Sequence, residues 1–409
     1  MLSIAEAQQC ILEQARPLPP VTARLDAPAL GLVLAEDVFS DVDMPPFTKA
    51  MMDGYAVRVQ DLPGGAGELA VVEELTAGKT PSKVVGAGQA TRIMTGAPMP
   101  EGADALVMVE RSQLRAGDRV CIEDAKLRVG QNVMLRAQEV RRGDLVLKTG
   151  TRLRPQEFGL LAAVGRINCQ LHPAPRVAIL STGDEVVEPS MVPGPNQIRN
   201  SNGPMLAALV RRAGGLPHYL GIAGDQGESL RPPIGEGLRD DVLILAGGVS
   251  AGKLDLVPQA LAELGVRPLF HQVEMKPGKP VLFGIKPHDV RGDSAKLVFG
   301  LPGNPVSALV CFELFVRPAL RAMMALPPGP RIVQAMLSED FPHRTDRPTY
   351  HPARLSAGAG GWTVQPVPWL GSPDLRGVTG SNAFVVLPVG DHQHRAGTLF
   401  PVLCVEEAE

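Results

Sequence analysis

The fold is decided by Arg176-Val177-Ala178-Ile179-Leu180-Ser181-Thr182-Gly183-Asp184-Glu185, an apolar run that ends in a polar turn. Short buried strands followed by glycine-rich turns and helix-like segments predict βα units around a parallel sheet. Ligands of such sheets bind beyond the carboxyl ends of the strands, so we expect a site where these turns meet. Three later runs repeat the pattern: His218–Ala223 before Gly224-Asp225-Gln226, Asp241–Leu245 before residues 246–255, and Lys296–Phe299 before residues 300–305.

Helix-start signals follow three of these turns. Asn304-Pro305 is the strongest, because Asn caps a helix and Pro fits its first position. Pro318 is expected to kink the helix that follows. The expected helices are Met205–Arg212 after Asn202-Gly203-Pro204, Leu256–Leu264 after Asp255, and Val306–Ala325.

Length and composition indicate a globular protein of two to four domains, with 409 residues, 44% hydrophobic and 20% charged. A net charge of −3 gives no general attraction to nucleic acid or to a membrane surface. The five scattered cysteines indicate neither a disulfide framework nor a zinc site. We find no signal peptide and no run long enough to span a bilayer, and we expect a cytoplasmic protein.

The chain is expected to be multidomain α/β plus β. Its centre is a doubly wound three-layer α/β domain over residues 173–326. A mixed α+β domain combines residues 1–46 with 141–172, a β-rich domain of residues 47–140 is inserted into it, and residues 327–409 form a C-terminal β-barrel-like domain. The expected strands outside the centre are Tyr55–Val59, Leu69–Glu74, Ala105–Val109, Arg119–Ile122, Lys126–Val129, Ile332–Leu337, Thr349–Leu355, Trp362–Val367 and Phe384–Leu387.

The turn Gly247-Gly248-Val249-Ser250-Ala251-Gly252 contains three glycines in six residues. Glycine lets a backbone approach an anion and point N–H groups at it. The turn matches neither the P-loop nor the dinucleotide fingerprint. Tight turns are the commoner cause of such glycines, so the motif alone is weak evidence for oxyanion binding.

Three carboxylates, Glu185, Asp225 and Asp255, follow neighbouring strands. Taken singly, each is best explained as a helix cap or turn acceptor. Together at one rim, they favour Mg²⁺ beside a substrate phosphate.

Two lysines, Lys276 and Lys279, flank a Pro-Gly turn that can direct both charges at one anion. Surface lysines are usually only solvated, and His392 and His394 are also expected to be solvated. Motifs of nucleophilic hydrolases and zinc proteases are absent from the sequence.

The chain resembles the molybdopterin molybdenumtransferases, the bacterial MoeA family, and is similar to the C-terminal domain of gephyrin. The resemblance covers nearly the whole chain. It is carried by residues 52–57 (MDGYAV), 94–105 (MTGAPMPEGADA), 181–185 (STGDE), 200–202 (NSN), 247–250 (GGVS) with Asp255, 275–280 (MKPGKP) and 301–307 (LPGNPVS).

The resemblance implies a reaction of molybdenum cofactor biosynthesis. Molybdate is inserted into adenylylated molybdopterin, AMP is released, and a divalent cation, usually Mg²⁺, takes part. The implied partners are a second copy of the chain, a molybdopterin adenylyltransferase and acceptor molybdoenzymes. The sequence leaves open whether tungstate replaces molybdate and which divalent cation acts.

The resemblance also implies roles for residues. Asp53 and Thr95 reach the site from the second subunit, although Asp-Gly is by default a hairpin turn. Glu185, Asp225 and Asp255 handle metal and phosphate. The implied substrate-binding residues are Ser181, Thr182, Gly183, Asn202, Gly247, Gly248, Ser250, Lys276, Lys279, Pro302, Pro305 and Ser307.

The sequence departs from the family pattern at three places. Residues 46–50 (PFTKA) replace P-F-D-x-S, and Glu139 stands where the family often has Asp, so its role stays open. Residues 371–375 (GSPDL) replace the usual C-terminal S-G-x-L stretch. The alternatives are a gephyrin-like scaffold without catalysis and a related molybdopterin adenylyltransferase.

Overall fold

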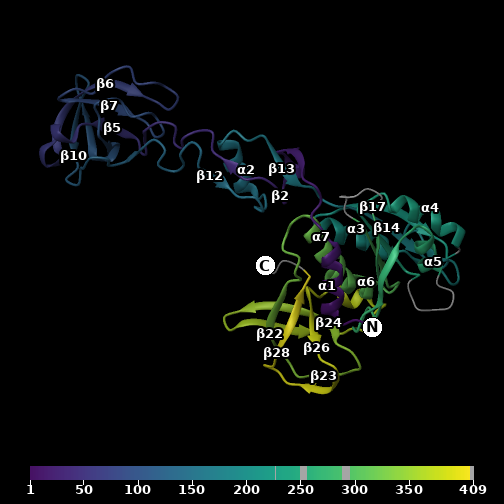
Figure 1. Ribbon diagram of the computed structural model, residues 1–409. Helices are drawn as coiled ribbons and strands as arrows, with labels where there is room; N and C mark the ends of the chain where they lie inside the picture. Colours follow the sequence, from purple (N-terminus) through teal and green to yellow (C-terminus); the bar gives the residue numbers. More distant parts are fainter. Residues whose placement is uncertain (226, 249–255, 288–294, 406–409) are drawn as a thin grey trace. The chain divides into compact units, whose positions relative to one another are not determined.

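The computed structural model of the chain (Figure 1) describes residues 1–225, 227–248, 256–287 and 295–405. The chain folds into two compact units, Met1–Ala35 with Gln170–Glu409, and Glu36–Cys169. The fold class is confirmed: a central α/β domain, a β-rich insertion and a C-terminal barrel are all present. The expected boundaries between four domains stay a prediction.

The central sheet has six strands in the order β17-β14-β18-β21-β20-β19. The first four strands run parallel, as expected from the apolar runs. β20 runs antiparallel to both of its neighbours, β21 and β19, so the sheet is mixed at this edge, where the sequence predicted parallel strands. The strands are β14 (Arg176–Thr182), β17 (Leu216–Ala223), β18 (Val242–Ala246), β19 (Arg267–Gln272), β20 (Pro280–Lys286) and β21 (Lys296–Leu301).

Helices cover both faces of this sheet. Along β14, Val177 and Ile179 pack into one apolar core, and Ala178 and Leu180 pack into another. Side chains alternate across a strand, so the two cores lie on opposite faces. The first core includes α3 (Asn202–Arg212), α6 (Pro305–Cys311) and α7 (Arg317–Met323), and the second includes α4 (Gly227–Gly237) and α5 (Leu256–Glu263).

The long helix expected after Asn304 is interrupted, but not by a simple kink at Pro318. A π-helical turn, η5 (Phe312–Val316), separates α6 from α7. A wider turn leaves carbonyls without their usual helical donors, and Gln8 Nε2 donates to Leu314 O at 3.0 Å. None of the helices in the described ranges combines the length and apolarity needed to cross a bilayer.

The first helix, α1 (Ile4–Gln14), begins at a capping box formed by Ser3 and Glu6. Its apolar side packs into the same core as α3 and α7. The chain also forms a three-stranded sheet. Its strands, in the order β1-β13-β2, are β1 (Val21–Arg24), β13 (Asn168–His172) and β2 (Val33–Leu34).

The second unit is built around a six-stranded sheet in the order β8-β5-β7-β6-β10-β9. The expected strand over Lys126–Val129 is wrong, because those residues form turns. The elements are β3 (Val38–Phe39), β4 (Lys49–Ala50), β5 (Gly54–Val57), β6 (Ala66–Leu75), β7 (Gln89–Ile93), β8 (Ala105–Met108), β9 (Ser112–Arg115), β10 (Arg119–Glu123), β11 (Val133–Met134), β12 (Leu145–Leu147) and α2 (Pro155–Ala163).

The C-terminal part closes into a five-stranded barrel in the order β22-β25-β24-β26-β28. Four of these strands were expected, and β28 was missed. The barrel core is apolar, with Val364, Val385 and Val402 fully buried. The elements are β22 (Ile332–Leu337), β23 (Phe341–Thr345), β24 (Thr349–Gly358), β25 (Gly361–Pro366), α8 (Leu375–Val378), β26 (Ala383–Leu387), β27 (Gly390–His394) and β28 (Leu399–Cys404).

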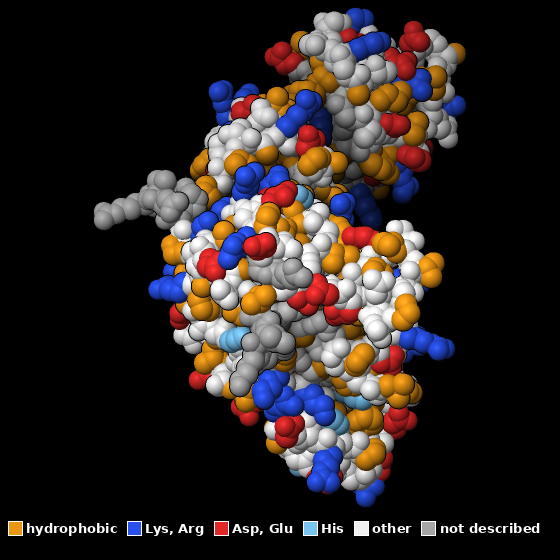
Figure 2. All heavy atoms as spheres, turned by 90° about the vertical axis from the view of Figure 1, so that its right-hand side faces the viewer, with side chains coloured by type: hydrophobic (Ala, Val, Ile, Leu, Met, Phe, Trp, Pro, Cys, Tyr) orange, Lys and Arg blue, Asp and Glu red, His pale blue; other side chains and the backbone are white. Residues whose placement is uncertain are grey.

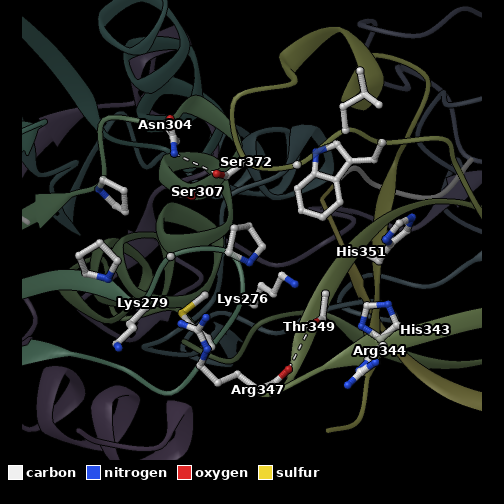
Figure 3. Close-up of a pocket in the computed structure, with 18 residues that line it drawn as sticks. Lys276, Lys279, Asn304, Ser307, His343, Arg344, Arg347, Thr349, His351 and Ser372 are labelled. Atoms are coloured by element: carbon white, nitrogen blue, oxygen red, sulfur yellow. Dashed lines mark hydrogen bonds between the residues drawn. The ribbon is translucent and has the colours of Figure 1, made fainter. Parts of the chain in front are cut away.

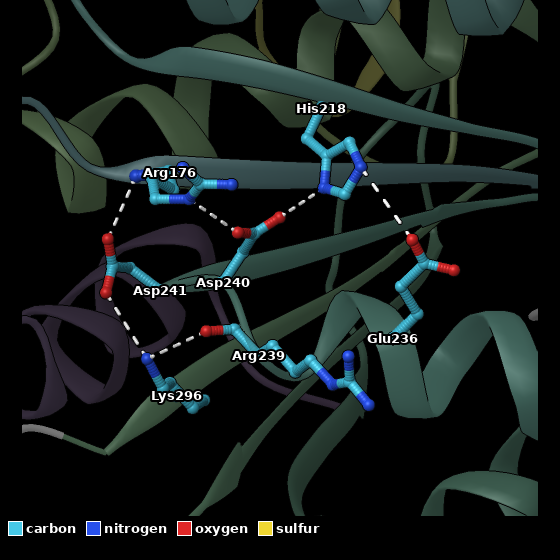
Figure 4. A network of polar contacts seen from close by, with 7 residues as sticks. All are labelled: Arg176, His218, Glu236, Arg239, Asp240, Asp241 and Lys296. Atoms are coloured by element: carbon cyan, nitrogen blue, oxygen red, sulfur yellow. Dashed lines mark hydrogen bonds and ion pairs between the residues drawn. The ribbon is translucent and has the colours of Figure 1, made fainter.

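A polar network ties together the amino ends of the central strands (Figure 4). Asp240 is 5% exposed and accepts hydrogen bonds from Arg176 Nε at 2.8 Å and from His218 Nδ1 at 2.7 Å. Lys296 Nζ donates to the neighbouring Asp241 at 3.3 Å. Burial opposes ionisation of Asp240, but Arg176 and His218 hold its pKa below the usual value.

Replacing Asp240 with asparagine is expected to lower the free energy of unfolding at pH 7 by about 1.5–3 kcal/mol, the contribution of hydrogen bonds to a charged group. A carboxyl whose pKa is lowered in the folded state stabilises above its unfolded pKa and loses that effect in acid. The difference in free energy of unfolding between wild type and Asp240→Asn should therefore become smaller below about pH 4. Thermal unfolding across pH measures it. Asp391→Asn, in an exposed ion pair, is the control and should change little.

Candidate active site

The carboxyl ends of β14, β18 and β21 open into a cavity of ≈ 580 Å³, which we call the strand-end cavity. It contains most of the turn residues that the sequence predicted for ligand binding. The described residues that line it include Ser181, Thr182, Gly183, Glu185, Asn200, Asn202, Asp225, Gly247, Gly248, Pro302 and Pro305. The fold therefore brings predicted residues together in one cavity, although they are up to 124 positions apart in the sequence, from Ser181 to Pro305.

Position 247 requires a glycine, because the neighbouring backbone packs too closely for a side chain. It has a φ of 100°, and a Cβ there would lie 2.5 Å from the carbonyl oxygen of Thr182. Its N–H donates to Leu301 O at 3.0 Å, which joins the ends of β18 and β21. The tight-turn explanation thus accounts for this glycine. Residues 249–252 of the expected glycine loop, including Ser250, lie outside the described residues.

The acidic side of the strand-end cavity contains Glu185 and Asp225. Asp225 N–H donates to Asp184 Oδ1 at 3.0 Å, so the turns after β14 and β17 are held together. Partial burial and the carboxylates of Asp184 and Glu185 raise the pKa of Asp225. Asp255, the third predicted carboxylate, lies outside the described residues, and the described residues contain no group of three metal-ligating side chains.

Asn200 forms hydrogen bonds that stabilise one wall of the strand-end cavity, a role that was not predicted from the sequence. Its Oδ1 accepts from Ser181 Oγ at 3.1 Å and from Gly203 N at 2.9 Å. Its Nδ2 donates to the Tyr219 hydroxyl at 2.7 Å. Asn200 therefore fixes both the Ser181 side chain and the first turn of α3.

A second cavity of ≈ 570 Å³ lies beside the first, and we call it the lysine cavity. Pro280, Pro302 and Asn304 line both cavities. The lysine cavity contains the predicted residues Lys276, Lys279 and Ser307 (Figure 3). Its remaining wall comes from the C-terminal part, with His343, Arg344, Arg347, Thr349, His351, Trp369, Leu370, Gly371 and Ser372.

The loop of Lys276 is attached to the barrel. Lys276 N donates to Pro348 O at 2.9 Å, and Tyr350 N donates to Lys276 O at 2.7 Å. Ser372, in the stretch that departs from the family pattern, accepts from Asn304 Nδ2 at 2.9 Å. Figure 2 shows Lys and Arg side chains gathered beside histidines at the lower end of the molecule, which the barrel forms.

Among the residues that line the lysine cavity, His343 has the most strongly shifted pKa. Burial, helped by His351 and by the charge of Lys276, lowers the pKa of His343 to about 4. It is therefore neutral at pH 7 and adds no positive charge to the lysine cavity. The sequence analysis missed His343, because a histidine in an alternating strand gives no local signal of function.

Asp53 and Thr95 lie together in the second unit. Asp53 Oδ1 accepts from the Thr95 hydroxyl and from Thr95 N, both at 2.7 Å. These bonds lower the pKa of Asp53. Asp53 precedes β5 in a bend, so the default hairpin-turn interpretation of Asp-Gly is wrong here.

Three family models match the chain in order. They are the MoeA N-terminal region (domains I and II) over residues 2–165, a probable molybdopterin binding domain over 178–322, and the MoeA C-terminal region (domain IV) over 334–405. Together they extend over most of the chain.

Sequence relatives and solved structures agree with these models. The molybdopterin molybdenumtransferase of Staphylococcus aureus strain Mu50 is 33% identical over 99% of this chain and 96% of its own length. The enzyme of the same name from Staphylococcus epidermidis is 32% identical with the same coverage. The molybdopterin biosynthesis MoeA protein from Pyrococcus horikoshii OT3 is 29% identical, with a TM-score of 0.79 over 99% of this chain and 100% of that chain. The chain therefore belongs to the MoeA family, the molybdopterin molybdenumtransferases of molybdenum cofactor biosynthesis.

Proposed function

We propose that the protein inserts molybdate into adenylylated molybdopterin and releases AMP. The observation that carries this proposal is the pair of adjacent cavities. The strand-end cavity has carboxylates and a glycine turn, and the lysine cavity has two lysines and a buried serine. A nucleotide phosphate that needs a cation fits the first, and a tetrahedral dianion fits the second.

In this reaction water cleaves the phosphoanhydride and gives AMP. The two dithiolene sulfurs bind molybdenum, and one oxo group of molybdate leaves as water. The chain supplies charge and position: Lys276 and Lys279 neutralise the dianion, and Ser307, 4% exposed, offers a hydroxyl. Pro302, on the wall common to both cavities, keeps the two ligands adjacent. Such fixed charges lower the barrier without a protein nucleophile.

A Mg²⁺ ion fits the acidic side of the strand-end cavity. Mg²⁺ retains several waters and needs only one or two protein carboxylates beside substrate phosphate. Glu185 and Asp225 provide two. Partial burial and the negative charges of Asp184 and Glu185 raise the pKa of Asp225, and a cation would offset those charges. When bound, the ion would neutralise phosphate charge during release of AMP. Asp255 is the proposed third ligand.

We also propose a homodimer in which the Asp53 and Thr95 pair of one subunit completes the site of the other. The bond between Thr95 and Asp53 keeps that carboxylate ionised and oriented. A molybdopterin adenylyltransferase would supply the substrate, and apo-molybdoenzymes would accept the product in the cytoplasm.

The test uses purified protein with adenylylated molybdopterin, Mg²⁺ and molybdate. We expect stoichiometric AMP and a cofactor that restores activity to an apo-molybdoenzyme. Absence of AMP would refute the proposal. A parallel reaction with molybdopterin and ATP should give no adenylylated product, and its formation would instead support the adenylyltransferase alternative.

A further inference from the structure

Two buried side chains of the strand-end cavity have a polar atom without a hydrogen-bond partner among the described residues. Thr182 is 3% exposed and its Oγ1 is unpaired, and Asn202 is 9% exposed and its Oδ1 is unpaired. A buried polar atom without a partner destabilises a protein, because it has lost its hydrogen bonds to water. In a ligand cavity, such atoms indicate contacts that the ligand completes.

The hydrogen bond of Asn202 fixes which of its atoms is unpaired. Asn202 Nδ2 donates to the carbonyl oxygen of Gly303 at 2.8 Å. The opposite amide orientation would place two oxygens against each other, so Oδ1 is the atom left without a partner. A carbonyl oxygen accepts hydrogen bonds and can also ligate a cation, so its partner is an N–H group, an O–H group or a metal ion.

Asn200 provides an internal comparison in the same cavity wall. Its oxygen has two donors and its amide has one acceptor, all supplied by the protein. Asn200 is thus structural. Asn202, two residues later at the start of α3, is bonded through its amide nitrogen only.

We propose that Asn202 determines nucleotide specificity, with Oδ1 accepting a hydrogen bond from a donor on the nucleoside and the Thr182 hydroxyl as a second contact. The inference rests on the proposed function, which places the adenylyl group in this cavity. An ionised phosphate oxygen has no proton to donate, so within the adenylyl group the contact is to the nucleoside. Its possible donors are the amino group of adenine and the ribose hydroxyls.

Calorimetric binding of AMP and three analogues to the full-length protein with Mg²⁺ tests this inference. Purine riboside monophosphate lacks the amino group, and 2′-deoxy-AMP and 3′-deoxy-AMP each lack one hydroxyl. We expect one analogue to bind wild type about 10-fold more weakly than AMP, as for a lost hydrogen bond to a buried acceptor. In Asn202→Leu the ratio of the Kd of that analogue to the Kd of AMP should fall to about 1.

Any of four results would overturn the inference. An unchanged ratio in Asn202→Leu, or equal binding of all four nucleotides to wild type, would remove Asn202 as the determinant. Asn200→Leu is the structural control and should weaken all four nucleotides equally, so the same behaviour from Asn202→Leu would assign Asn202 a structural role. If AMP itself does not bind wild type, the placement of the nucleotide under the proposed function fails, and the inference fails with it.

Discussion

Lys276→Ala is expected to lower kcat/KM for molybdate by about 100- to 1000-fold, the usual effect of removing one fixed charged donor from an active site. Lys276 lies in the lysine cavity, and its loop is hydrogen-bonded on both sides of the residue to the barrel. The backbone of Lys276 is thus held beside the lysine cavity, where a dianion would bind. The ammonium group supplies the positive charge that the dianion needs.

Steady-state AMP release at varied molybdate measures this effect. Lys276→Arg, which keeps the charge, should recover part of the activity. Lys286 serves as the control, because it lies at the end of β20 and lines neither cavity. Lys286→Ala should retain wild-type kinetics. Unchanged molybdate kinetics in Lys276→Ala would remove that lysine from the site.

Asp225→Asn is expected to lower kcat by a similar factor, about 100- to 1000-fold, and to remove the response to Mg²⁺. The substitution removes one of the two described carboxylates of the strand-end cavity. The backbone bond from Asp225 N to Asp184 stays available, so the turn should keep its structure.

The same variant should be more stable than wild type in the absence of metal. Asp184 and Glu185 repel the Asp225 carboxylate, and partial burial also disfavours its charge. An acid whose pKa is raised by folding destabilises the native state at neutral pH, so its neutral replacement raises Tm. A higher Tm with lost turnover would identify a site where stability is sacrificed for function. A lower Tm would show that Asp225 is structural.

The sequence predicted the central domain well because its strands are short and apolar and each ends in a polar turn. The antiparallel edge was missed, because an apolar run such as that of β20 does not encode its direction. The closing barrel strand β28 was also missed, since Leu399–Cys404 contains Pro401 and follows a polar stretch. No strand forms over Lys126–Val129, because the apolar pattern there is short and lies among residues that favour turns.

Sequence reasoning singled out residues where the local chemistry was unusual, and their roles in binding and catalysis stay a prediction. The carboxylates and the two lysines follow turns that converge in three dimensions, and the strand order brings them together. The barrel side of the lysine cavity was not predicted, because His343, Arg347 and Trp369 have ordinary neighbours in sequence. Asn200 was missed for a related reason: its role depends on Tyr219, 19 positions away.

The central claim is that two anions occupy separate but adjacent cavities of one chain. Diffraction from crystals soaked with molybdate and AMP, with anomalous data at the molybdenum edge, tests it most directly. We expect the molybdenum peak in the lysine cavity within reach of Lys276 and the AMP phosphate in the strand-end cavity near Asp225. A molybdenum peak beside Asp225, or AMP bound in the lysine cavity, would contradict the account.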